Sequence, residues 1–356
     1  MKNTLILILI LCSILSAHSQ LRNNDVYKLT EMNESGIRDI IRIPDIEGYK
    51  TLKCDFHTHT VFSDGKVWPD VRVNEAWKEG LDAIAITDHI EYRPLKNTVK
   101  GDLNESFKIA KKRGDALGFI VIQGTEITRA KPIGHLNALF IADANPMDTK
   151  DPRGAIDIAI AQGAFIMWNH PGWPDNKSTL YPIHDSLINE KKIHGVEVFN
   201  HTTYYPVSFD WCKNRGLAFM GNSDIHELVK HDYGSDIAAR PVTLVFATER
   251  SEKGIKEALF AKRTAACFNG QLAGKAEHLT ELFKASLAIE TKNAEKGIYE
   301  IANISDITYQ ILVNKQQYSL PAGKTRRITL PKEGKIKILN CFTGMDEHLE
   351  VDLPLL

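Results

Sequence analysis

The chain has 356 residues, of which 43% are hydrophobic and 25% are charged. This composition is typical of a globular protein and excludes a mainly disordered chain or a protein with many membrane spans. Lysine and arginine number 44 and aspartate and glutamate 45, which gives a formal net charge of -1. We therefore predict no nucleic-acid partner and no general attraction to anionic membranes, and we favour a small molecule as the partner.

The first residues have the pattern of a secretory signal. Lys2 precedes an apolar run over residues 5–15, and the sequence Ser-Ala-His-Ser comes next at 16–19. The run is too short for a membrane-spanning helix, and the small residues after it suit cleavage before Gln20. We predict that residues 1–19 are a signal peptide, that the mature protein is periplasmic or extracellular, and that no membrane attachment remains after cleavage.

From about residue 50 to 270, apolar runs bounded by turn residues alternate with amphipathic segments. This alternation predicts βα units around a parallel sheet or barrel. The expected helices are 70–79, 104–117, 154–162, 207–214 and 252–262. The expected strands are 52–56, 83–87, 119–123, 136–141, 164–168, 195–199, 218–221 and 242–246. About seven or eight such strands suit an irregular α/β barrel of the TIM kind.

The composition changes after about residue 290. Short strand-like runs with turns between them cover 299–304, 308–313, 326–329, 335–339 and 349–351. They predict a small antiparallel β domain over residues 289–356, beside an α/β domain over residues 20–288. The C-terminal part holds no cluster of titratable residues, so we expect it to have an accessory or packing role and not a catalytic one.

A pair of histidines closes the first expected strand. In Asp55-Phe56-His57-Thr58-His59, side chains alternate across the strand, so that residues 55, 57 and 59 share one face. Two imidazoles on one face can bind a single metal ion. Asp55 is either a partner that orients one of these imidazoles or a plain polar residue near a strand end.

Further titratable residues recur where other expected strands end. They are Asp64, Asp88, His89, Glu126, His170, Asp224 and His226. In a parallel barrel the C-terminal ends of the strands meet at one rim, which is where active sites lie. His135 begins an apolar run instead of ending one, so we expect residues 127–134 to fold back as a hairpin that returns His135 to the same rim.

Five sequence motifs occur in a fixed order between about residues 50 and 230: H-T-H-x-x-x-S-D-G, T-D-H, G-T-E, N-H-P and D-x-H. They resemble the PHP (polymerase and histidinol phosphatase) superfamily of metal-dependent phosphoesterases. With the signal segment, the chain is similar to an exported branch that acts on small organophosphate diesters. The resemblance implies a distorted (β/α)7 TIM-like barrel with a trinuclear metal centre.

The resemblance also implies a ligand set for each ion. It assigns one ion to His57, His59, Glu126 and Asp224, a second to Glu126, His135 and His170, and a third to Asp64, His89 and His226. Ligands shared in this way leave positions open for water and substrate, which is typical of catalytic sites. We expect two or three divalent ions, which these residue types allow to be zinc, manganese or iron.

The expected reaction is the hydrolysis of a small organic phosphate ester, with a phosphodiester preferred. Adjacent cations lower the pKa of a bound water from 15.7 toward about 7, so hydroxide is available as the nucleophile. They also neutralise the phosphoryl oxygens. His201 is a candidate to protonate the leaving alkoxide, with an ordinary loop histidine as the alternative.

Three basic residues lie beside the expected site segments and are candidates to bind the phosphate, against the alternative of solvated surface charge: Arg129, Lys131 and Arg240. Four aromatic residues are candidates to wall a pocket for an apolar or aromatic ester group, against the alternative of a core position: Trp168, Trp173, Tyr204 and Tyr205.

Three other functions stay open. The first is a phosphomonoesterase similar to histidinol phosphatases. The second is an amidohydrolase, whose usual bridging lysine and lone final aspartate are replaced here by Glu126 and D-x-H. The third is a non-catalytic exported metal-binding protein, against which the open coordination argues. The oligomeric state is not predicted.

Overall fold

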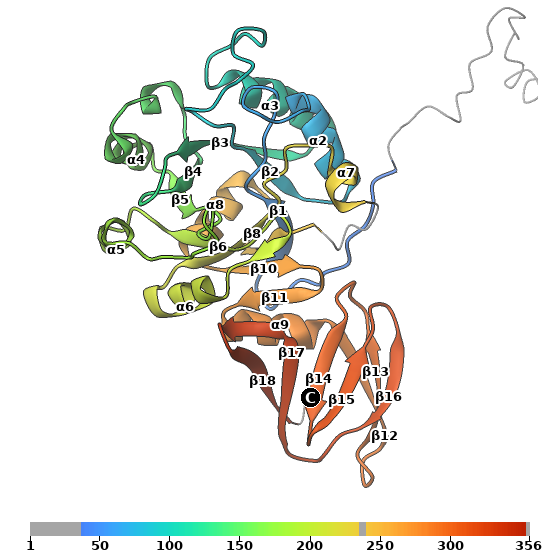
Figure 1. The fold of residues 1–356 in the computed structure, drawn as a ribbon. Helices are drawn as coiled ribbons and strands as arrows, with labels where there is room; N and C mark the ends of the chain where they lie inside the picture. The colour runs from blue at the N-terminus through green and yellow to red at the C-terminus, as the bar shows by residue number, and fades with distance from the viewer. Residues whose placement is uncertain (1–36, 235–239, 354–356) are drawn as a thin grey trace, which may run out of the picture. The chain divides into compact units, whose positions relative to one another are not determined.

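A computed structural model describes residues 37–234 and 240–353 of the chain. The expected signal peptide, residues 1–19, lies outside these described residues. Within them, strands and helices alternate from β1 to α9 and strands alone come after α9 (Figure 1). No helix in the described ranges is long and apolar enough to cross a membrane.

The strands of the first part form a mixed sheet. They are β1 (Lys50–Asp55), β2 (Ala83–Ile86), β3 (Ile120–Thr128), β4 (His135–Leu139), β5 (Phe165–Trp168), β6 (Gly195–Asn200), β7 (Thr203–Tyr204), β8 (Ala218–Asn222), β9 (Val242–Ala247), β10 (Thr264–Phe268) and β11 (Gln271–Gly274). The pairs β1–β2, β2–β3, β5–β6 and β6–β8 are parallel, as expected for βα units.

The barrel-like sheet is open where β8 meets β9. Within the described residues these two strands share no ladder, and the Thr243 hydroxyl instead bonds to the backbone N–H and carbonyl of Gly221. A Cβ at position 221 would lie only 3.0 Å from the carbonyl oxygen of Val242. Glycine therefore permits the close approach of the two strands.

The antiparallel hairpin of β3 and β4 interrupts the parallel order. Thr128 pairs with His135 and Glu126 with Asn137. β4 then pairs antiparallel with β5. The expected hairpin is thus present, although the strands extend into it and leave only residues 129–134 as the connection. His135, the first residue of β4, lies beside the last residue of β3.

Helices cover the outside of the strands (Figure 1). They are α2 (Pro69–Lys78), α3 (Glu105–Leu117), the 3-10 helix η3 (Asn145–Met147), α4 (Pro152–Ala161), α5 (Pro182–Asn189), α6 (Pro206–Arg215), α7 (Val229–Tyr233), α8 (Glu252–Phe260) and α9 (Ala276–Ala285). Proline opens α2, α4, α5 and α6, where its fixed φ suits a helix start. The sequence pattern did not predict α5, α7 and α9; α7 has only five residues, too few for a helical period.

The C-terminal strands confirm the expected antiparallel β region. They are β12 (Leu287–Asn293), β13 (Ile298–Asn303), β14 (Tyr309–Val313), β15 (Gln316–Leu320), β16 (Thr325–Thr329), β17 (Gly334–Gly344) and β18 (Glu347–Leu353). β12, β13 and β16 form a separate three-stranded sheet. β17 pairs in parallel with β11, so the main sheet continues into the C-terminal strands.

One buried apolar cluster joins the two regions. It includes Ile84 of β2 and Ile338 of β17, together with Phe283 of α9. The boundary expected between residues 288 and 289 falls inside β12, next to this shared core. The C-terminal strands therefore pack as a continuation of the α/β part.

We expect Phe283→Ala to lower the free energy of unfolding by about 3–5 kcal/mol, because it leaves a cavity in the shared core. Phe283 is buried and packs edge-on against Tyr309 of β14, with ring centroids 5.0 Å apart. Scanning calorimetry should show a single transition at a lower temperature. Ile304→Ala, at a side chain that is 54% exposed, is the control. An early separate transition of the C-terminal strands would contradict a shared core.

Candidate metal centre

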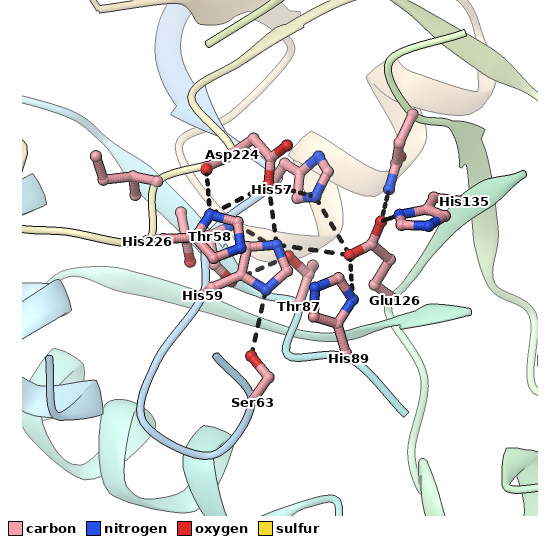
Figure 2. Close-up of polar contacts among 12 residues, drawn as sticks. His57, Thr58, His59, Ser63, Thr87, His89, Glu126, His135, Asp224 and His226 are labelled. Atoms are coloured by element: carbon pink, nitrogen blue, oxygen red, sulfur yellow. Dashed lines mark hydrogen bonds and ion pairs between the residues drawn. The ribbon is translucent and has the colours of Figure 1, made fainter. Parts of the chain in front are cut away.

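Nine side chains with metal-binding atoms gather at one rim of the sheet. They are His57, His59, Asp64, His89, Glu126, His135, His170, Asp224 and His226. They follow or end β1, β2, β3, β5 and β8, and His135 begins β4. Figure 2 shows imidazoles from several of these elements turned toward the carboxylates of Glu126 and Asp224. Residues far apart in sequence thus meet because parallel strands end at the same rim.

Two imidazoles of the cluster, those of His57 and His59, lie close to two carboxylates. Asp224 Oδ1 lies 3.1 Å from His57 Nε2 and 3.0 Å from His59 Nε2. Glu126 Oε2 lies 3.6 Å and 3.5 Å from the same two nitrogens. Four ligands at the usual distance from a tetrahedral zinc ion are roughly 3.3 Å apart. The atoms of His57, His59 and Asp224 form one group that could hold an ion, and those of His57, Glu126 and His170 form another. The four ligands that the resemblance gives to one ion are therefore divided between two groups that share His57.

Glu126 is shared between this group and its neighbours. Its Oε1 lies 2.9 Å from His135 Nδ1 and 3.7 Å from His170 Nε2. Its Oε2 lies 2.7 Å from His89 Nδ1. Each oxygen of this carboxylate thus faces a different set of imidazoles, which is the arrangement needed to bridge two ions.

Asp64 lies close to two imidazoles and forms a further group of ligand atoms with them. Its Oδ1 lies 3.1 Å from His226 Nε2 and 3.4 Å from His89 Nε2. Because His89 Nδ1 faces Glu126, His89 lies between two groups. This differs from the ligand sets that the resemblance implies, which place His89 with the third ion alone. In the structure, His89 also groups with Glu126 and His135.

Four buried atoms of the cluster lack a hydrogen-bond partner among the described residues: His57 Nε2, His59 Nε2, Asp64 Oδ1 and Glu126 Oε2. A buried polar atom without a partner costs about 1–3 kcal/mol. Several such atoms in one place indicate that something else binds them. Imidazole nitrogen and carboxylate oxygen together suit zinc, manganese or iron, so the donor set fits divalent cations.

The charges of the cluster keep its carboxylates ionised. Burial acts to raise the pKa of Glu126, but the imidazoles of His89 and His57 outweigh it and hold this pKa well below its usual value. The pKa of Asp224 is also held low against burial, chiefly by His57. For Asp64, burial acts to raise the pKa but is outweighed by the adjacent imidazole of His226, and the pKa falls to about 2. All three groups are therefore in the form that binds metal ions.

A buried glutamate that the motifs did not single out orients the first histidine. Glu197 of β6 accepts hydrogen bonds at Oε1 from His57 Nδ1 at 2.9 Å and from Asn222 Nδ2 at 3.0 Å. Its Oε2 accepts from the His170 N–H at 2.7 Å and from Asn200 Nδ2 at 2.8 Å. A proton on Nδ1 leaves the Nε2 lone pair of His57 free for a metal ion. The available signal was a charged residue inside an otherwise apolar strand.

Asp55 and Arg240 have roles other than those expected. Asp55 Oδ1 accepts from the backbone N–H groups of His57 and Ser223, each at 3.2 Å, and not from an imidazole. Arg240 is only 2% exposed; it donates to Asp55 Oδ2 at 2.6 Å and also pairs with Glu79. Two carboxylates thus enclose its guanidinium. This departs from the expectation that Arg240 binds phosphate, because the side chain fixes the turn after β1 instead.

The remaining candidates lie around the cluster. Arg129 and Lys131, from the β3–β4 connection, line a cavity beside it. His201 lies in the turn after β6, where its side chain is 45% exposed and its Nε2 lies 3.8 Å from Asp232 Oδ2. Its ring contacts that of Tyr233. A role of His201 as proton donor stays a prediction.

Two residues of the cluster have strained backbones. The φ angle is 26° at His170 and 51° at Asp224. Residues other than glycine rarely adopt positive φ angles. Such conformations cost of the order of 1–3 kcal/mol and cluster at functional sites, where surrounding contacts impose them. At His170 the N–H is held by Glu197 and the carbonyl by the N–H of Trp173 at 2.9 Å.

The fold and the gathered side chains together define a class of protein: metal-dependent hydrolases built on a distorted barrel. The PHP domain family matches residues 55–306, and the chain belongs to this family. The resemblance seen in the motifs is thereby confirmed.

Solved and curated proteins are similar to this chain to different degrees. A two-domain protein from Bacteroides vulgatus, described as containing a predicted PHP-like metal-dependent phosphoesterase, is 38% identical, with a TM-score of 0.84 over 89% of this chain and 98% of that one. An uncharacterized protein of Methanocaldococcus jannaschii is 38% identical over 81 residues, which are 23% of this chain and 36% of that protein. A lesion-specific endonuclease of Pyrococcus furiosus is 15% identical, with a TM-score of 0.40 over 60% of this chain and 56% of that one.

We expect Glu197→Gln to lower metal affinity or activity by about 10–100-fold while the fold is retained. The amide group would place a donor among groups that already donate, including His57 Nδ1. Metal content after dialysis against a competing chelator, with circular dichroism to verify the fold, measures the effect. Glu47→Gln, at an exposed carboxylate, is the control. Equal metal retention by both variants would contradict the orienting role.

Proposed function

We propose that this member of the PHP domain family hydrolyses a small organic phosphate ester, with a phosphodiester as its preferred substrate. The observation that carries the proposal is the pair of ligand groups that share His57, one with His59 and Asp224 and the other with Glu126 and His170. Metal-dependent hydrolysis of phosphoric esters is the chemistry of the family. We further propose that the protein is exported, on the pattern of residues 1–19.

The cluster would hold two or three divalent ions. The groups that would hold them are His57, His59 and Asp224; His57, Glu126 and His170; His89, Glu126 and His135; and His59, Asp64, His89 and His226. Bound divalent ions supply an acidified water for attack and positive charge for the phosphoryl oxygens. Zinc, manganese and iron all suit this donor set.

Residues of the chain fix this arrangement in place. Glu197 holds the imidazole of His57 and the backbone of His170, so that both face the carboxylate of Glu126. Asp55 holds the backbone N–H of His57 and is itself held by Arg240. Such preorganisation matters because a displacement of about 1 Å at the reacting groups can cost on the order of 100-fold in rate.

The cavity beside the cluster supports a diester over a monoester. Its volume of about 570 Å³ accommodates an organic group next to the phosphoryl group. The basic side chains that line it, Arg129 and Lys131, are each paired with a carboxylate. Among the described residues of its lining, the cavity thus offers no free cation for the second negative charge of a monoester. A diester carries one charge and an additional organic group, which matches this lining.

Rates on p-nitrophenyl phosphate and bis(p-nitrophenyl) phosphate test the proposal, because the two esters share a leaving group. We expect faster hydrolysis of the diester, complete loss of activity after EDTA treatment, and recovery with Mn²⁺, Zn²⁺ or Fe²⁺. A faster monoester would instead make the protein a phosphatase. Full metal loading without turnover of either ester would favour a metal-binding protein without enzymatic activity.

Glu126→Gln should reduce the rate by about 100-fold or more and remove at least one bound ion, because it takes away the charge shared between ligand groups. Elemental analysis of the purified variant, paired with its rate on the diester, measures both effects. Glu47→Gln should keep the normal rate and metal content. A Glu126→Gln variant with full occupancy and normal rate would refute the shared role of this carboxylate.

A further inference from the structure

The cavity of about 570 Å³ opens directly beside the metal-binding cluster. It lies between the connection of β3 to β4 and the segment after β5. His135 and His170 belong both to its lining and to the cluster. A group bound in this cavity would therefore be next to a phosphoryl group at the cluster. Its volume is within the range of small-molecule sites, about 300–1,000 Å³.

Stacked rings form the floor of the cavity. The ring centroids of Trp168 and His184 lie 3.7 Å apart, and both side chains are buried. Both nitrogens of His184 are already bonded: Nε2 lies 2.9 Å from the Ile133 carbonyl oxygen, and Nδ1 accepts from the Tyr181 N–H at 3.2 Å. No motif singles out His184, which is fully buried among the residues that line the cavity and whose polar atoms are unavailable to a ligand.

The charged groups at the rim neutralise one another. Arg129 Nη2 lies 2.7 Å from Glu91 Oε1. Lys131 Nζ lies 2.5 Å from Asp175 Oδ1 and donates to the Lys177 carbonyl oxygen at 2.8 Å. The second pair also links the two segments that flank the cavity. Each cation is thus paired with a carboxylate, while the buried Nε of Arg129 has no hydrogen-bond partner among the described residues.

Trp173 forms an open wall next to the cluster. Its side chain is 54% exposed, although it is one of the largest apolar side chains. Its ring centroid lies 4.9 Å from that of His135 and 5.8 Å from that of His170. A half-exposed indole at this position can lie against a ligand ring while the metal-binding imidazoles hold the other end of the ligand. Of the four aromatic candidates, Trp168 and Trp173 line the cavity.

We propose that this cavity binds the organic group of the phosphate ester, and that this group is uncharged and aromatic, lying against Trp173. The inference rests on the proposed function, because that function places the phosphoryl group at the cluster. The ring would lie against the exposed indole of Trp173, in a cavity that Trp168 and His184 also line. A second phosphate or a carboxylate on the same group would lose its hydration without gaining a cation from Arg129 or Lys131, which are already paired.

Binding of phenylphosphonate and methylphosphonate to the manganese-loaded full chain tests the proposal without turnover. Both carry the same phosphonate for the cluster and differ only in the group offered to the cavity. We expect phenylphosphonate to bind about tenfold more tightly by calorimetry, because its ring is buried against aromatic side chains. 4-Carboxyphenylphosphonate should lose this gain.

Trp173→Ala should reduce the preference for phenyl over methyl to about twofold or less, and Trp173→Phe should restore most of it. Trp68→Ala is the matched control, because this tryptophan is 51% exposed and does not line the cavity. It should keep the full preference. The ratio of the two affinities is unaffected by a general loss of active protein, so misfolding of a variant would not imitate the effect.

Equal affinity for the two phosphonates, or a preference unchanged in Trp173→Ala, would overturn the proposal, as would failure of both to bind. These outcomes are separate from those that test the proposed function. Hydrolysis of the diester without any phenyl preference would leave the function standing and remove only the aromatic specificity.

Discussion

The structure depends on holding ionised carboxylates together in a buried place. Glu126 is fully buried, and its Oε2 faces imidazoles that also approach Asp224 or Asp64. Like charges brought this close repel one another unless cations lie between them. The imidazoles supply positive charge to these carboxylates, and divalent ions held by the cluster would add to it. The contacts that surround the cluster hold these carboxylates in the positions that metal binding requires.

The antiparallel hairpin makes this sharing possible. In an unbroken parallel barrel, each strand would bring a residue to the rim only from its C-terminal end. Here β4 runs backward, so His135 comes to the rim at the start of its strand, across from Thr128 at the end of β3. The carboxylate of Glu126 can then meet His135 on one side and His89 on the other. A local reversal of chain direction thus adds a ligand position that strict βα alternation does not offer.

The sequence predicted those parts of the site that local patterns carry. Alternation in the H-x-H strand and titratable residues at strand ends pointed to the nine residues that the structure gathers. The sequence analysis missed Glu197 because its role depends on a contact with His57, and these two residues are 140 positions apart in the chain. Arg240 misled because a basic residue near a site segment looks the same in sequence whether it faces substrate or Asp55. The burial that distinguishes these cases depends on tertiary packing.

The parallel pairing of β11 with β17 has a consequence for shortened forms of the chain. A chain ending near residue 288 would keep all nine of the gathered side chains. It would, however, leave β11 as an exposed edge strand with unpaired N–H and carbonyl groups. Exposed edge strands pair with strands of other molecules and lead to aggregation. The C-terminal strands can thus be essential to a soluble catalyst while contributing no atom to its chemistry.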